Sequence, residues 1–384
     1  MFPINIIIAV TNISIGNGGV STHIVDMCRE LLLRKHKVIL VSDPEHCDYY
    51  NRIEEFNHME GFKFVPVKLN GFLSSPTSLF KVTNTFIKIA RQEKADIAHM
   101  HSQSLCIVGA LMKAATGTPF LWTNHIDEIW KPKLFKVVLK TFHFPIISVS
   151  SDLKRMLIEQ YGVKANRITV VNNGIDITKF SPLTVNEKQE LIEKYDCNGK
   201  YVIGILARMS YGKGHKYLLE AVDKLQTKNK LSNLKVLIAG KIHESEIGYY
   251  QSLDLFAKEH SIDTEFIGFQ NPRDIFGICN ISVLPSIYEG FALTAVESLI
   301  MGCPVIRSDT PGWSDMQDIT LVFHKKNVEG LKQHLLYSYT HQTEMINMGL
   351  KGKSIVEEKF TIGIQVEKTL DVYQKYSKKL FSNN

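Results

Sequence analysis

The sequence predicts an α/β protein built from two Rossmann-like, doubly wound domains that face each other across a cleft. Short apolar segments of the kind that form buried strands alternate with amphipathic segments almost throughout the chain. This alternation is typical of parallel sheets covered by helices. A polar stretch that contains Pro182 interrupts the pattern once, near the middle of the chain. The length of 384 residues allows two or three domains of about 150 residues each.

The apolar segments form two sets, and each set predicts one sheet. The polar stretch places a linker at residues 179–199, between a first domain at 1–178 and a second at 200–360. An amphipathic C-terminal segment, 361–384, follows the second domain. Because ligands of such sheets bind at the carboxyl ends of the strands, functional motifs are expected directly after strands. The predicted strands are 4–10, 37–42, 96–100, 120–123, 146–150 and 168–171 in the first domain, and 201–207, 234–239, 265–268, 281–284 and 304–307 in the second.

The composition is that of an ordinary globular protein and excludes several classes. A hydrophobic content of 44% with 22% charged residues supports substantial cores. The six cysteines show no Cys-x-x-Cys spacing, which favours free thiols in a reducing compartment. The first ten residues lack the basic region of a signal peptide, and no apolar run reaches the roughly 18 residues of a membrane span. We therefore expect a cytoplasmic protein, and a net charge of +6 gives no reason to expect a nucleic-acid partner.

Two glutamates flank the start of a predicted helix in residues 285–302, the most informative segment. A buried-type strand ends just before it, so Glu289 falls in a strand-to-helix loop and Glu297 lies one or two turns into the helix. The first N–H groups of a helix have no intrahelical partner and favour a phosphate, and a carboxylate suits the paired hydroxyls of a ribose. The segment therefore predicts a sugar-nucleotide site, although a turn acid and a solvated helix residue would also explain the glutamates alone. The phosphate donors would be the backbone N–H groups of Phe291, Ala292 and Leu293.

A second motif with the chemistry of a diphosphate site follows the first strand of the second domain. Arg208 and Lys213 lie five residues apart in a loop that also contains Gly212 and Gly214. A guanidinium and an ammonium together neutralise a diphosphate through charge-assisted hydrogen bonds. Two solvated surface charges are the simpler explanation, and the residues alone leave both open.

Glycines also follow the first strand of the chain, in the segment from Gly16 to Val20. Glycines let the backbone approach a ligand, and the helix that follows offers N–H groups to an anion. A dinucleotide site is one explanation, because Asp43 follows the second strand where a ribose-binding acid would lie. The third glycine of that fingerprint is missing, however, and Ser21 stands in its place, so NAD is not expected.

Histidines gather at the ends of two predicted strands of the first domain, at His99, His101 and His125, with Asp127 close by. This cluster raises the hypothesis of a metal site. No helical His-x-x-x-His pair and no cysteine ligand supports it, and the chain has no Asp-x-Asp motif. The sequence therefore predicts no metal and no other cofactor.

The segment 285–302 resembles the Glu-x7-Glu region of retaining glycosyltransferases of family 4, which have the GT-B fold. The similarity continues through residues 302–312 and includes the Arg-x4-Lys spacing and the Gly-Gly-Val loop, whereas residues 313–316 depart from the family pattern. The resemblance implies that the first domain faces the acceptor, that the second binds a nucleotide sugar, and that the C-terminal helix crosses back to the first domain. Ala292 stands where many relatives have glycine, and we expect ordinary helical backbone there.

The resemblance also implies roles for single residues. Arg208 and Lys213 would clamp the diphosphate, and Glu289 would hold hydroxyls of the transferred sugar. His125 lies in a segment similar to the family's Thr-x-His-Asp and would contact the donor sugar, whereas His99 and His101 would be structural or lie on the acceptor side. By this resemblance the catalytic residues are His125, Arg208, Lys213 and Glu289, and the donor-binding residues are Gly18, Gly19, Gly268, Gly290, Phe291, Ala292, Leu293 and Glu297.

The implied activity is transfer of a hexose or N-acetylhexosamine, with retention, from a UDP- or GDP-sugar to a saccharide or lipid-linked acceptor. A retaining hydrolase needs two carboxyl groups about 5 Å apart. Eight residues of helix would place Glu289 and Glu297 about 12 Å apart, so we expect transfer without a covalent enzyme intermediate. A GT-B-fold sugar-nucleotide epimerase and a non-catalytic sugar-nucleotide-binding protein remain alternatives.

Residues 130–142 combine lysines with aromatic and aliphatic residues and contain no acidic residue. Lys133, Lys136 and Lys140 share one face of a predicted helix. A solvated helix face explains this pattern, and so does docking on an anionic membrane surface, where each lysine contributes about 1 kcal/mol. The second interpretation predicts a peripheral contact with the inner face of the membrane through the segment from Trp130 to Phe142.

Overall fold

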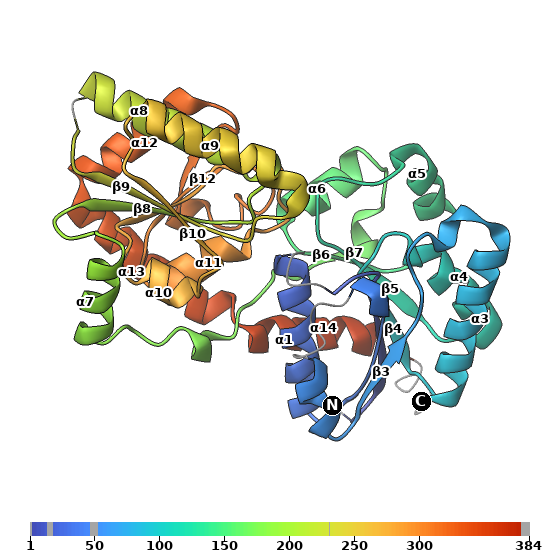
Figure 1. Ribbon diagram of the computed structural model, residues 1–384. Coiled ribbons are helices and arrows are strands. Elements are labelled where there is room, and N and C mark those ends of the chain that lie inside the picture. The colour runs from blue at the N-terminus through green and yellow to red at the C-terminus, as the bar shows by residue number, and fades with distance from the viewer. Residues whose placement is uncertain (1, 14–17, 47–52, 230, 378–384) are drawn as a thin grey trace. The chain divides into compact units, whose positions relative to one another are not determined.

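The computed structural model describes residues 2–13, 18–46, 53–229 and 231–377 (Figure 1). The chain divides into two compact units. Unit 1 contains the residues up to Asn173 together with the C-terminal segment from Ile362, and unit 2 contains Gly174 to Thr361.

Unit 1 is built on a parallel sheet of seven strands in the order β3-β2-β1-β4-β5-β6-β7. The six strands predicted for the first domain are all present. The edge strand β3 was not predicted, because its residues are only partly buried and form no continuous apolar run. The strands are β1 (Asn5–Ala9), β2 (Lys37–Ser42), β3 (Phe62–Pro66), β4 (Ile97–Met100), β5 (Phe120–Asn124), β6 (Ile146–Ser148) and β7 (Ile168–Val170).

Helices cover both faces of this sheet, because alternate residues of a strand point to opposite faces. Ile7 and Ala9 of β1 pack into one core, and Ile6 and Ile8 pack into another. The C-terminal helix α14 adds Tyr373 to the second core and lies beside α1 (Figure 1). It thus returns to the first unit, as predicted. The helices are α1 (Gly19–Leu33), α3 (Pro76–Gln92), α4 (Leu105–Thr116), α5 (Pro132–Thr141), α6 (Ser151–Glu159) and α14 (Ile362–Tyr376).

Unit 2 contains a parallel sheet of six strands in the order β10-β9-β8-β11-β12-β13, of which only the short edge strand β13 was not predicted. The strands are β8 (Tyr201–Leu206), β9 (Leu234–Ala239), β10 (Thr264–Gly268), β11 (Ile281–Leu284), β12 (Val305–Ser308) and β13 (Leu321–Phe323). The helices are α7 (Val185–Lys194), α8 (His215–Asn229), α9 (Ile247–Glu259), α10 (Pro272–Phe276), α11 (Leu293–Ile300), α12 (Val328–Thr340) and α13 (Gln342–Lys359).

The segment expected to be a linker, residues 179–199, carries helix α7 and is fixed to unit 2. The guanidinium of Arg273 donates to the carbonyl oxygen of Ser181 at 2.7 Å and pairs with the carboxylate of Glu187 at 3.0 Å. Thr184 caps the helix in a reciprocal capping box with Glu187. These bonds make the segment part of the folded unit.

The strand orders locate the expected ligand-binding edge of each sheet. In both sheets the direction of winding reverses beside the first strand, between β1 and β4 in unit 1 and between β8 and β11 in unit 2. Ligands of open α/β sheets bind where the strand order reverses, at the carboxyl ends. The loops after β1, β4, β8 and β11 are therefore the places to look for a site.

Two further expectations concern the compartment and the membrane. Five of the six cysteines belong to the described residues and are free thiols, and four of these are buried; Cys47 lies outside the described part of the chain. Across the residues that the structure describes, no helix has both the length and the apolar character that a membrane span requires.

Candidate functional site

Two motif loops of unit 2 meet beside the point where its strand order reverses. The N–H of Ile287, after β11, donates to the carbonyl oxygen of Gly212, after β8, at 2.8 Å. Gly214 has a φ of +74°, and a Cβ added there would lie 1.9 Å from the carbonyl oxygen of Pro285. Only glycine combines this backbone conformation with so close an approach. The structure thus brings together the two motifs that the sequence singled out.

Lys213 and Glu289 form an ion pair between these loops. The Nζ atom of Lys213 lies 2.5 Å from Oε1 of Glu289, which also accepts a hydrogen bond from the Ser286 hydroxyl at 2.8 Å. The Glu289 side chain is only 12% exposed. Burial raises the pKa of this carboxyl, but the Lys213 ammonium, the Ser286 hydroxyl and the charge of Arg307 outweigh burial and hold the pKa below its usual value. Glu289 is therefore a carboxylate at neutral pH and not a proton donor.

Arg307 near the end of β12 is a buried cation whose charge acts on Glu289, and sequence reasoning missed it. Its side chain is buried, and the guanidinium donates to the carbonyl oxygens of Thr310 and Pro311 at 3.0 and 3.1 Å. The same loop packs against the start of α11, where a Cβ on Gly312 would lie 2.7 Å from the Cα of Phe291. A cation at the end of an otherwise apolar strand was the signal in the sequence.

The expectation of ordinary helical backbone at Ala292 is wrong. Ala292 is the N-cap of α11 and has a left-handed conformation, with φ of 66° and ψ of 75°. An L-residue pays about 1–2 kcal/mol for this conformation, because its Cβ approaches the following carbonyl oxygen. Helix α11 therefore begins at Leu293, directly after a strained residue.

The other predicted donor-binding residues of unit 2 are distributed around these loops. Gly290 and Phe291 are buried in the loop before α11, and Glu297 is partly exposed one turn into the helix. Arg208 is exposed in the loop after β8. Gly268 ends β10 with a φ of +67°, and its carbonyl oxygen accepts from the N–H of Gly240 at 2.7 Å.

The glycine motif of unit 1 leads into helix α1. Gly18 is the N-cap with a φ of 63°, and Gly19 is the first helical residue, whereas Gly16 lies outside the described residues. Asp43 is fully buried, and its carboxylate accepts from the N–H groups of Leu69 and Asn70, both at 2.7 Å. These bonds occupy the acid that a dinucleotide site would use for ribose, which counts against the NAD alternative.

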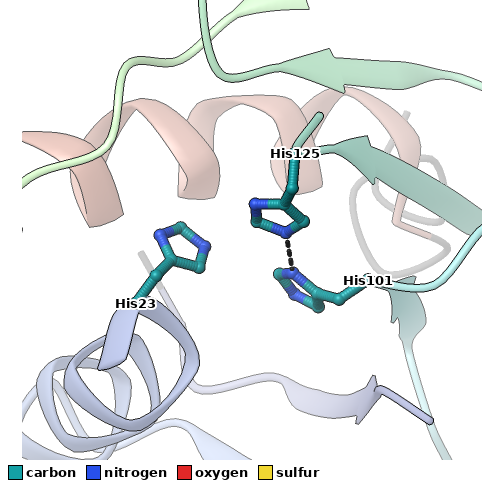
Figure 2. Close-up of side chains that lie close together, drawn as sticks. All are labelled: His23, His101 and His125. Atoms are coloured by element: carbon teal, nitrogen blue, oxygen red, sulfur yellow. Dashed lines mark hydrogen bonds between the residues drawn. The ribbon is translucent and has the colours of Figure 1, made fainter. Parts of the chain in front are cut away.

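The histidines of unit 1 form one buried group, and the structure adds a member from α1. His101 Nδ1 lies 2.8 Å from Nε2 of His125, and the ring of His23 lies 5.0 Å from that of His125, between ring centroids (Figure 2). His99 is bonded on both sides, to Tyr373 at 2.6 Å and to Thr123 at 2.5 Å. Sequence reasoning missed His23 because it lies 76 residues before His99 and 102 residues before His125 along the chain.

Burial decides the protonation of these rings. It lowers the pKa of His23 to about 4, and it lowers the pKa of His99, His101 and His125 well below the usual value, with neighbouring histidines adding to the effect. The imidazoles are therefore neutral at physiological pH. Each can donate one hydrogen bond and accept another.

A cavity of about 680 Å³ opens in unit 1 at the carboxyl ends of β1 and β4. Polar side chains after these strands line it, among them Thr11, Asn12 and Ser102. Gln103 closes one side through hydrogen bonds of its amide to the backbone N–H and carbonyl of Trp130, at 3.0 and 2.6 Å. The cavity thus combines hydrogen-bonding groups with an aromatic rim.

Helix α5 and the residues directly before it expose apolar and basic side chains together. Trp130, Leu134 and Val137 are each more than half exposed, and Lys133 and Lys140 lie among them. The sequence placed Lys136 on the same face, but its ammonium donates to the carbonyl oxygen of Gln160 at 2.9 Å. Trp130 and Lys131 also belong to the rim of the cavity.

Comparison with known families agrees with this geometry. The model of Glycosyltransferase Family 4 matches residues 17–179, and the model of Glycosyl transferases group 1 matches residues 187–350. The chain belongs to the family 4-type GT-B glycosyltransferases. The two matches fall on the two units that carry the histidine group and the paired motif loops.

Individual relatives support the same assignment. An uncharacterized glycosyltransferase of Methanocaldococcus jannaschii is 23% identical over 94% of this chain and 91% of its own length. The UDP-Gal:alpha-D-GlcNAc-diphosphoundecaprenol alpha-1,3-galactosyltransferase of Escherichia coli is 26% identical over 59% of this chain and 60% of its own length.

Two solved structures have the same fold. The crystal structure of a glycosyltransferase from Rickettsia africae covers the whole of both chains, with a TM-score of 0.85 and 20% identity. Anabaena HepE in complex with UDP and glucose has a TM-score of 0.79 at 16% identity, over 96% of this chain and 99% of its own.

Proposed function

We propose that this glycosyltransferase moves a hexose or N-acetylhexosamine from a UDP- or GDP-sugar to a hydroxyl of a saccharide or lipid-linked acceptor, with retention of configuration. The observation that carries the proposal is the contact of Lys213 with Glu289, which joins a cation suited to phosphate and a carboxylate suited to sugar hydroxyls. The Escherichia coli relative is named for a UDP-galactose donor and a diphosphoundecaprenol-linked acceptor. HepE was crystallised with UDP and glucose.

The donor's diphosphate would be held by charge and by backbone dipoles. Arg208 and Lys213 supply two cations, and backbone N–H groups at the start of α11 would supply further donors. Lys213 has three N–H donors, so it can keep its bond to Glu289 while it contacts a phosphate oxygen. Glu297, one turn into α11, would accept from the ribose hydroxyls. Nothing in this arrangement requires a divalent ion at the diphosphate.

Transfer then proceeds without a covalent bond to the protein. The anomeric C–O bond breaks, and its electron pair goes to the diphosphate oxygen, where Arg208 and Lys213 stabilise the developing charge. The acceptor oxygen bonds to the anomeric carbon from the same face and gives its proton to the departing diphosphate. Glu289 remains ionised beside Lys213 and holds sugar hydroxyls. His125, a neutral imidazole, would donate a hydrogen bond to the donor sugar.

The acceptor would bind in unit 1. The 680 Å³ cavity offers hydroxyl and amide groups for a saccharide, and its rim continues into the exposed face of α5. A lipid-linked acceptor suits this combination, because exposed Trp130, Leu134 and nearby lysines favour an anionic bilayer surface. Vesicle co-sedimentation tests it: the chain should bind vesicles that contain phosphatidylglycerol, and Leu134→Glu should weaken binding. Equal binding of both proteins, or none by either, would contradict the membrane contact.

The donor is best identified by thermal shift, since a ligand that binds the native state raises apparent stability. A UDP- or GDP-sugar that raises the melting temperature is then incubated with and without lipid-linked and free saccharide acceptors. Transfer requires an acceptor, an epimerase would convert the donor alone, and a binding protein would do neither. Lys213→Ala and Glu297→Ala should lower kcat/KM for that donor. If both variants kept the wild-type KM and kcat, the assignment of the donor site would be wrong.

A further inference from the structure

Three histidines of unit 1 point toward one another from three different elements (Figure 2). His23 comes from α1, His101 follows β4, and His125 follows β5. His23 and His101 are 4% and 6% exposed, and His125 is partly buried. One ring nitrogen of each lies within 4.8 Å of the other two. Such convergence of three imidazoles needs an explanation beyond packing.

Several ring nitrogens of this group have no ordinary hydrogen-bond partner. Nε2 of His101, Nδ1 of His125 and both nitrogens of His23 are buried without one. The side chain of Gln365 interacts with the ring of His23, but outside ordinary hydrogen-bond geometry. Buried polar atoms in folded proteins are nearly always paired, with protein groups, water or an ion. A neutral imidazole carries one N–H and one lone pair, so the three rings can together offer three lone pairs to a ligand that accepts electron pairs.

We propose that His23, His101 and His125 bind one divalent cation of the zinc class. Neutral imidazoles are ligands for Zn²⁺, Co²⁺, Ni²⁺ and Cu²⁺, whereas Mg²⁺ and Mn²⁺ favour oxygen ligands. Three histidines fill three positions of a tetrahedral site and leave the fourth to water or another oxygen ligand. This proposal does not depend on the proposed transfer reaction.

The geometry requires modest movement of the rings. Zinc–nitrogen bonds of about 2.0–2.1 Å place ligand nitrogens about 3.3 Å apart in a tetrahedral site. Nδ1 of His101 and Nε2 of His125, now 2.8 Å apart, would separate by about half an ångström to bind one ion. The proton between them would move to the other nitrogen of the ring that now donates it, Nε2 of His101 or Nδ1 of His125, neither of which has a partner at present. The widest of the three separations is no more than 4.8 Å and would close by about 1.5 Å through side-chain rotation.

His99 would support the site without being a ligand. Both of its ring nitrogens are already bonded, to Tyr373 and to Thr123. Its ring lies 4.0 Å from that of His101, between centroids. This contact limits the rotation of His101, as neighbours of metal ligands commonly do.

The test is equilibrium dialysis of the full chain, freed of metal with a chelator, against Zn²⁺ and against Co²⁺. We expect one equivalent of either ion, a visible Co²⁺ spectrum typical of four-coordination, and no displacement by excess Mg²⁺. His23→Gln and His101→Gln should each weaken binding at least about tenfold. His143→Gln is the matched control, since His143 is exposed in the same unit and should leave binding unchanged.

Circular dichroism and thermal unfolding test whether each variant is folded. If one of the ligand variants does not fold, His23→Asn takes its place. The proposal is overturned if the wild-type chain binds no stoichiometric ion. It is also overturned if the His23 and His101 variants bind as tightly as wild type, if Mg²⁺ competes equally, or if only His143→Gln loses binding. The metal-binding measurement uses no sugar donor or acceptor. Absence of metal binding would therefore not affect the proposed transfer reaction, and absence of transfer would not affect the metal-binding result.

Discussion

The ion pair between Lys213 and Glu289 makes a prediction that can be worked through in numbers. Charges about 4 Å apart attract by about 4 kcal/mol at an effective dielectric constant of 20. The Nζ–Oε1 contact of Lys213 and Glu289 is shorter, 2.5 Å, so the same relation gives about 7 kcal/mol for this pair, in which the Glu289 side chain is 12% exposed. Desolvation offsets most of the attraction, so Lys213→Met should cost about 1–3 kcal/mol of stability, mainly because a poorly hydrated carboxylate loses its partner.

The pH dependence gives the sign of the effect. In the wild type the pKa of Glu289 is lower in the folded protein than in the unfolded chain, where it is about 4.3. Ionisation of Glu289 therefore stabilises the fold at pH values above about 4.3, and this stabilisation is lost as the pH falls through the pKa of the folded protein. Without Lys213, burial is the dominant influence and raises that pKa. Lys213→Met therefore lowers the stability of the protein at neutral pH, where Glu289 is a buried carboxylate without its partner, and lowers it less in acid, where the carboxyl is protonated. The difference from wild type should be largest near pH 7 and shrink toward pH 4.

The assay is urea unfolding of wild type, Lys213→Met, Glu289→Gln and the double variant at pH 7 and pH 5. The double-mutant cycle isolates the coupling of the pair, which we expect to be about 1–3 kcal/mol at pH 7. Lys258→Met removes an exposed helix pair with Asp254 in the same unit and should change nothing measurable. A coupling near zero, or a Lys213→Met effect that does not vary with pH, would refute the reasoning.

Three more predictions concern backbone strain and burial. Ala292→Gly should stabilise the protein by up to about 1 kcal/mol and raise its melting temperature, because glycine adopts the left-handed conformation without strain. An unchanged or lower melting temperature would contradict this prediction. Gly214→Ala should cost more than about 3 kcal/mol and abolish donor binding in thermal shift, because its Cβ would lie 1.9 Å from the Pro285 carbonyl oxygen. Gly248→Ala, whose Cβ meets nothing within 4 Å, is the control and should be tolerated. As the pH is lowered from 6.5 to 4, the free energy of unfolding should fall by up to about 1.4 kcal/mol per pH unit from His23 alone, because His23 takes up a proton in the unfolded chain but stays neutral in the folded one. A free energy of unfolding that does not change over this range would refute the argument that burial keeps His23 neutral.

Much of the fold could be predicted because central parallel strands are buried on both faces and read as continuous apolar runs. Strands such as β1 and β8 therefore stand out in the sequence. The two missed strands, β3 and β13, lie at sheet edges, where one side has no neighbouring strand and burial is incomplete. Alternating or short edge strands carry a weaker pattern.

The motif loops of unit 2 could be predicted because their chemistry is local. Arg208, Lys213 and Glu289 stand out by residue type and spacing, and the structure joins the last two in an ion pair. The left-handed backbone of Ala292 could not be predicted, because tertiary contacts such as the approach of Gly312 to Phe291 fix this turn. His23 could not be grouped with the other histidines because only the folded sheet brings α1 beside the ends of β4 and β5.

The most direct test of the central claim is the anomeric configuration of the product, followed by NMR during turnover with the donor that the thermal-shift screen identifies. Our account predicts a new glycosidic bond with the same anomeric configuration as the donor, formed only when acceptor is present. An inverted product, or conversion of the donor without acceptor, would contradict it.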